Sequence, residues 1–215
     1  MKVYVGFALL FVAQVSFAND HNNIEHGRPL LFDDAYSIAY GEREFQFGLD
    51  LNSRRSGLMS SLSYGFAKNQ ELSFGFESSK GSTTVSEVSY FQSISREIEN
   101  SPALGFRLTA NSAPGTKPSG QLKMVATKAL HQYDKVHLNV DFDTDQSPGF
   151  ILAYSSPLGY PKKFDQTLVS ELVFRRNETS VGLGIRKQID ARSILDLGVR
   201  VGKQVNAVMG YSISF

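Results

Sequence analysis

Apolar and polar side chains alternate with a period of two from residue 42 to the end of the chain. In the first such stretch Phe45 and Phe47 share one face, while Glu44 and Gln46 share the other. Successive side chains of an extended strand point to opposite sides, so this alternation is typical of β-strands with one apolar face. The sequence therefore predicts an all-β protein.

The alternation recurs about twelve times along the 215 residues. Most of the stretches have the length of roughly 9 to 11 residues that a tilted strand needs to cross a bilayer. Turn-forming residues separate them, as in Ala113 to Gly120 and Ser147-Pro148-Gly149. An even number of strands, between 10 and 12, fits a bacterial barrel with both chain ends on the periplasmic side.

The residues on the two faces favour a membrane barrel over a soluble β-sandwich. One face of nearly every stretch is apolar, and the other carries small, polar and charged residues, many of them Gly or Ser. Lipid tolerates no unpaired strand edge, so strands with such faces must close on themselves. We therefore predict a closed antiparallel transmembrane β-barrel over residues 42–215.

The last strand ends the chain on a row of alternate apolar residues. Such an ending looks like the signal that the barrel assembly machinery of the outer membrane reads, and it consists of Met209, Tyr211, Ile213 and Phe215. Assembly machinery and outer-membrane lipid are thus the expected partners.

The first residues resemble an export signal. Lys2 is followed by a mostly apolar run from Val3 to Val15, and Ser16-Phe17-Ala18 offers small residues before a cut. The run is shorter than the roughly 20 residues of a membrane-spanning helix. We predict a cleaved signal peptide over residues 1–18, a periplasmic lead-in over residues 19–41, and the bacterial outer membrane as the location.

Composition excludes several classes of function. The chain has no cysteine, so thiolate metal sites, thiol catalysis and disulfides are excluded. Its 22 Lys and Arg nearly balance 21 Asp and Glu, whereas nucleic-acid binding needs a concentrated basic face. No motif indicates a cofactor.

Several segments resemble the phenol meta-pathway (MetA-type) family of outer-membrane barrels. They are His26-Gly27-Arg28-Pro29-Leu30, Asp33-Asp34-Ala35-Tyr36, Gly41-Glu42-Arg43-Glu44-Phe45 and the stretch from Gln188 to Gly198. The resemblance implies a barrel with a part in moving small, often hydrophobic molecules. It implies no catalytic residues.

The polar face of the predicted strands would line the lumen. Its charged residues are of both signs: Glu44, Asp50, Glu77, Glu87, Arg107, Lys123, Asp141, Glu171, Arg175, Arg186, Asp196 and Arg200. Such residues either line a narrow wet channel or pair and plug it. We predict a small channel or transporter for small molecules, with a structural barrel plugged by charge pairs as the alternative.

A barrel hydrolase is the less favoured alternative. His137 is the one candidate base, with Asp141 on the same face, but a histidine in a polar network is the commoner case. His137, Asp141 and Asp143 could also share a face as metal ligands, although strand neighbours of this kind are usually solvated or paired. We therefore expect no enzyme and no metal site.

Overall fold

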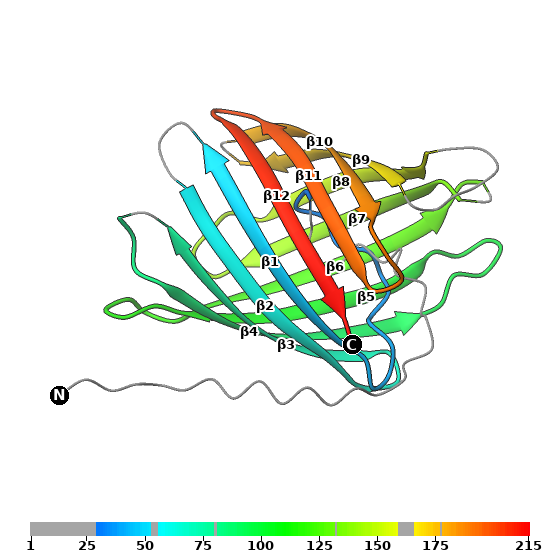
Figure 1. Cartoon of the computed structure of the whole chain (residues 1–215), viewed down its shortest axis with the longest axis horizontal. Coiled ribbons are helices and arrows are strands. Elements are labelled where there is room, and N and C mark those ends of the chain that lie inside the picture. Colours follow the sequence, from blue (N-terminus) through cyan, green and yellow to red (C-terminus); the bar gives the residue numbers. More distant parts are fainter. Residues whose placement is uncertain (1–28, 53–55, 80, 132, 159–165, 177) are drawn as a thin grey trace.

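The chain forms a closed barrel of twelve antiparallel strands, as the sequence predicts (Figure 1). The computed structural model describes residues 29–52, 56–79, 81–131, 133–158, 166–176 and 178–215. The predicted signal peptide, residues 1–18, lies outside the described residues. Among the described residues, no helix is long and apolar enough to cross a membrane.

Each strand pairs with its neighbours in the sequence, and β1 pairs with β12 to close the barrel. The strands are β1 (Arg43–Asn52), β2 (Ser56–Ala67), β3 (Gln70–Ser79), β4 (Val85–Ser95), β5 (Ala103–Ser112), β6 (Ser119–Ala129), β7 (Lys135–Asp143), β8 (Gly149–Pro157), β9 (Gln166–Arg175), β10 (Glu178–Gln188), β11 (Ser193–Val201) and β12 (Val205–Ser214).

The last residue of the chain takes part in closing the barrel. Phe45 lies opposite Ile213, and Arg43 and Phe215 exchange two main-chain hydrogen bonds of 3.0 and 2.8 Å. The first and last strands therefore meet along their whole length, and no strand edge is left open. We call the end of the barrel where β1 begins and β12 ends the terminal mouth, and the other end the opposite mouth.

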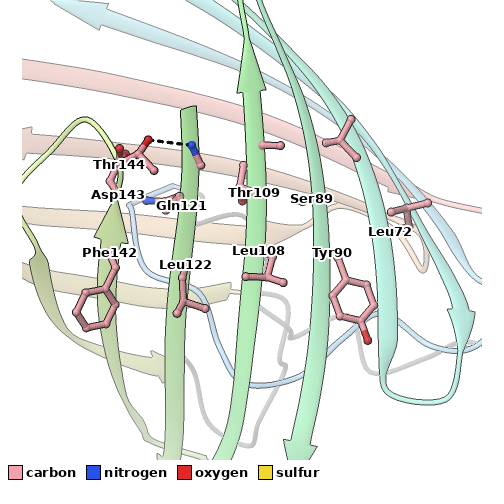
Figure 2. A pocket seen from close by; sticks show the side chains of 13 residues that line it. Leu72, Ser89, Tyr90, Leu108, Thr109, Gln121, Leu122, Phe142, Asp143 and Thr144 are labelled. Carbon is pink, nitrogen blue, oxygen red and sulfur yellow. Dashed lines mark hydrogen bonds between the residues drawn. The ribbon is translucent and has the colours of Figure 1, made fainter. Parts of the chain in front are cut away.

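The outer surface of the barrel is apolar. Figure 2 shows one part of it, where Tyr90, Leu108, Leu122 and Phe142 follow one another across β4, β5, β6 and β7. Rows of this kind continue around the barrel, and many of their large apolar side chains are exposed. A surface of exposed leucine, valine and phenylalanine on every strand is stable against hydrocarbon and unstable against water.

Residues 29–38 differ from the prediction of a periplasmic lead-in over residues 19–41, of which residues 19–28 lie outside the described part of the chain. Residues 29–38 have no regular secondary structure and lie inside the barrel, in dark blue in Figure 1, whereas Tyr40 is exposed. Leu30, Phe32, Asp33 and Ala35 are each less than 5% exposed. We call residues 29–41 the lumen segment. Its apolar beginning, Pro29 to Phe32, and the polar pair Asp33-Asp34 that follows do not distinguish a segment that crosses a lumen from one outside it.

Candidate functional site

Side chains of the barrel wall bind the main chain of the lumen segment. The N–H groups of alternate residues donate to side chains of three strands: Leu31 to Glu171 Oε2 (2.8 Å), Asp33 to Asn139 Oδ1 (2.6 Å) and Ala35 to Thr127 Oγ1 (3.0 Å). The amide of Asn139 makes a second hydrogen bond to the segment, because its nitrogen donates to the carbonyl of Asp33 at 2.9 Å. The wall thus supplies the hydrogen bonds that a buried main chain requires.

Asp33 anchors the segment to two cations of the wall. Its Oδ2 lies 3.1 Å from Lys123 Nζ and 3.4 Å from Arg107 Nε. Arg107 also reaches Glu71 Oε1 at 3.4 Å, and its guanidinium lies over the ring of Phe91. Asp33, Arg107 and Glu71 are all nearly inaccessible to solvent. Charges this deep are tolerated only because each has a partner.

The other side of the segment is held by apolar packing. Phe32 is fully buried in a cluster with Leu30, and its ring lies 4.8 Å from that of His137 between centroids. The wall contributes four inward-facing apolar residues of β8 and β9 to this cluster: Ile151, Ala153, Val169 and Val173. This apolar patch interrupts the polar lining that the sequence predicts for the lumen. Phe32 covers the patch and shields it from water.

Two glycines of the wall make room for the beginning of the segment. A Cβ added to Gly184 would lie 2.5 Å from Pro29 Cγ, and one added to Gly198 would lie 3.0 Å from Pro29 Cβ. Any larger residue at either position would therefore push Pro29 away. The inner wall of β10 and β11 is shaped to the lumen segment.

Three further ion pairs lie on the lumen wall. Arg186 and Asp196 are both buried and form two hydrogen bonds, of 2.9 and 3.2 Å. The two other pairs are more exposed: Arg200 with Asp50 at 3.0 Å and Arg175 with Asp141 at 3.7 Å. These pairs are the ones that the charge-plugged alternative expects.

The half of the lumen toward the opposite mouth is open. It holds a cavity of approximately 350 Å³, which we call the vestibule, and its floor includes Asp33, Arg107 and Lys123. Four acidic residues of the strands and of the adjoining turn line its upper part: Glu77, Glu87, Asp143 and Asp145. The vestibule thus leads from the opposite mouth down to the lumen segment and ends there.

At the terminal mouth, the segment is tied to a turn of the barrel. Tyr36 Oη donates to Glu97 Oε2 at 3.3 Å, and Lys128 Nζ lies 3.1 Å from Glu97 Oε1. Burial, together with the negative charges of Glu97 and Asp34, raises the pKa of Tyr36 to about 12. Burial alone would raise the pKa of Glu97, but the N–H of Ala129 and the ammonium of Lys128 lower it below its ordinary value.

The geometry around His137 favours neither a hydrolase with His137 as its base nor a metal site. Both ring nitrogens are engaged, Nδ1 with Thr127 Oγ1 at 3.1 Å and Nε2 with Ser155 Oγ at 2.9 Å. The ring is fully buried under Phe32, so a substrate cannot reach it while the segment is in place. Within the described part of the chain, His137, Asp141 and Asp143 do not form a metal-binding group.

All twelve charged residues that the sequence assigns to the lumen lie on inward-facing positions of their strands. Besides the pairs described above, Glu44 accepts a hydrogen bond from Gln46, while Glu77 and Glu87 line the vestibule. Sequence reasoning missed Asp33, Glu71 and Asn139. Glu71 directly follows a turn, so its sequence position does not distinguish it from a turn residue. The lumen segment has no alternation of apolar and polar residues that would indicate which wall residues it contacts.

Solved structures resemble this chain in fold. A KdgM porin matches with a TM-score of 0.65 at 13% identity, covering 80% of this chain and 99% of that chain. A NanC porin matches at 0.58 and 7%, covering 80% and 98%. An outer membrane channel from Pseudomonas putida F1 matches at 0.56 and 12%, covering 85% and 98%. No protein-family model and no curated protein matches the chain.

Proposed function

We propose that this protein is a small-molecule channel of the bacterial outer membrane, closed in this conformation by its own residues 29–41. The observation that carries the proposal is the vestibule, which opens at one mouth and ends on the lumen segment. A lumen of this kind is a path for solutes once the segment moves. The apolar outer surface and the likeness in fold to porins support a place in the outer membrane.

The two chain ends give the barrel an orientation. Barrels of this class keep both ends on the periplasmic side, so the terminal mouth would face the periplasm and the vestibule the cell exterior. The row Met209, Tyr211, Ile213 and Phe215 would serve assembly, since Phe215 closes the barrel against Arg43. Relation to the MetA-type family also stays a proposal, supported only by the segments that resemble it.

The manner of closure favours a channel over a barrel sealed for structural reasons alone. A permanently sealed lumen would be filled by wall side chains, as Arg186 and Asp196 fill it locally. Here the path is closed by a segment outside the strands. Side chains of the wall accept hydrogen bonds from its N–H groups at Leu31, Asp33 and Ala35, and at its end Gly41 donates its N–H to the carbonyl of Gly65 in β2 at 2.7 Å. Residues 29–38 can therefore leave the lumen without breaking the pairing of the strands.

Planar-bilayer recordings of the refolded protein test the proposal. The wild type is expected to conduct rarely, because the lumen segment closes it most of the time. The double variant Phe32→Ala/Asp33→Ala loses both anchors of the segment and should conduct more often. Phe174→Ala, on the outer face of β9, removes an aromatic ring without touching the lumen and is the matched control. Wild type and double variant both remaining at background conductance would support the sealed structural barrel instead.

A further inference from the structure

The lumen segment occupies a site whose wall has two unlike halves. On one side lies the apolar patch that receives Phe32, and on the other lie Lys123 and Arg107, which receive the carboxylate of Asp33. Between them Asn139 binds the main chain that joins the two side chains. An apolar group and a carboxylate on a short polar linker are thus the features that this wall binds.

We infer that this site binds an amphipathic carboxylic acid, an aromatic or other apolar group joined to a carboxylate by a short flexible chain, and that Phe32 and Asp33 occupy it as an internal ligand. The inference rests on the proposed function, since it names the class of solute that the channel takes. Consecutive Cα atoms are about 3.8 Å apart, so a linker of a few bonds is enough to reach both halves.

The wall without its segment would be poorly solvated. Val169 and Ile151 would face water, Lys123 would lose the carboxylate of Asp33, and Arg107 would keep only the carboxylate of Glu71 among the anions described above. A buried cation that has lost its partner is strongly destabilising. A solute that replaces both the ring and the carboxylate removes both costs, whereas an apolar molecule or a simple anion removes only one.

The solute can reach the cations from the vestibule, because Lys123 and Arg107 belong to its floor. The carboxylates above them, Glu77 and Glu87, repel an anion on its way. This repulsion acts through solvent, and at about 0.3 M salt the screening length is only about 6 Å. The pairing with the floor is more buried and is screened less.

Isothermal titration of the refolded protein in detergent at that salt concentration tests the inference. The probe is 4-phenylbutyrate, and the comparison ligands are butyrate, which lacks the ring, and 4-phenylbutanol, which lacks the charge. We expect 4-phenylbutyrate to bind at least about tenfold more tightly than 4-phenylbutanol, because a hydrogen bond to a charged group contributes this much. It should also bind at least about tenfold more tightly than butyrate, because burying the ring contributes a similar amount. The variant Phe32→Ala/Asp33→Ala should bind it at least about tenfold more tightly than the wild type, because the internal competitor is lost.

Two lumen variants locate the site. In the Phe32→Ala/Asp33→Ala background, where the internal ligand does not compete, Lys123→Met should weaken 4-phenylbutyrate binding about tenfold or more. In the same background Arg200→Met, which removes a lumen cation paired with Asp50 elsewhere, should leave it unchanged. Heat-modifiable migration on gels verifies that each variant is folded. If the double variant does not fold, the three ligands titrated into the wild type carry the test.

The inference is overturned if 4-phenylbutyrate gives no heat of binding, if 4-phenylbutanol binds as tightly, or if adding Lys123→Met to the double variant leaves binding unchanged. These outcomes are separate from the channel proposal, since the titration needs no conduction. A protein that conducts but does not bind the probe rejects this inference alone. One that binds the probe but never conducts rejects the proposed channel and leaves the binding site in place.

Discussion

The outer and inner faces of the same twelve strands differ in how closely their side chains must fit their surroundings. On the outer face, Leu183 and Leu197 need only be apolar, because a fluid hydrocarbon adapts to their shape. On the inner face, Arg186 needs Asp196 and the lumen segment needs Asn139, each within hydrogen-bond distance. The outer face can therefore vary freely within a class of residues, whereas the inner face depends on individual partners.

The largest effect is expected where a buried inner pair is broken. Asp196→Ala removes the carboxylate that makes two hydrogen bonds with the buried guanidinium of Arg186, which should cost about 3–5 kcal/mol of the free energy of unfolding. Urea unfolding in detergent micelles, followed by gel migration, measures it. Leu197→Val on the outer face of the same strand should cost about 1 kcal/mol or less. If the two variants lose the same free energy of unfolding, the two faces do not differ in this way.

A charge placed on the outer face should cost nearly as much. Leu183 lies near the middle of β10, where an arginine would face the interior of the bilayer; Leu183→Arg should lose about 2–4 kcal/mol. Leu183→Phe keeps the side chain apolar and serves as the control. The same unfolding assay in lipid bilayers measures both variants. A Leu183→Arg protein as stable as the wild type would mean that this face is wet.

A smaller effect is expected where only the lumen segment is loosened. Asn139→Ala leaves the N–H of Asp33 buried without an acceptor, which should cost about 1–3 kcal/mol of segment docking. The barrel strands are untouched, so conductance should rise several-fold while the unfolding of the barrel changes little. Gln121→Ala, in the vestibule wall, is the control. Loss of barrel stability without a rise in conductance would show that the segment and the strands unfold together.

The smallest effect is expected at the terminal mouth. The folded pKa of Glu97 lies below its ordinary value, so its ionised form stabilises the fold above the ordinary pKa. That stabilisation disappears as pH falls through the folded pKa. Between about pH 5 and pH 3 the wild type should lose more stability than Glu97→Gln, by less than about 1 kcal/mol for a pair this exposed. Unfolding curves of the wild type and Glu97→Gln at the two pH values measure this difference. If the stability of both proteins depends on pH in the same way, Glu97 does not contribute to it.

The strands and their faces could be predicted from the sequence because hydrocarbon imposes one simple rule on every second residue. Phe45 and Phe47 follow it at the start of the barrel and Tyr211 and Ile213 at the end, and the twelve predicted strands are confirmed. The rule says nothing of which inner residues meet. Arg186 and Asp196 are ten residues apart, and only the register of β10 and β11 places them opposite each other.

The lumen segment could not be predicted for a different physical reason. Its contacts join residues about a hundred positions apart, as between Asp33 and Asn139. A segment held by wall side chains needs no period of its own, so Phe32 and Asp33 carry no local signal. The apolar inward residues Ile151 and Val169 were the available indication, because a lumen that held only water would not favour them.

Closure of the lumen by residues 29–41 is tested most directly by cross-linking the segment to the wall. The chain has no cysteine, so the pair Ala35→Cys/Thr127→Cys introduces the only thiols, at positions joined by a 3.0 Å hydrogen bond. We expect oxidation to form the disulfide and abolish channel opening in planar bilayers, and a reducing agent to reverse both effects. A folded protein whose thiols do not join, or a cross-linked protein that conducts as often as the reduced one, would contradict this closure.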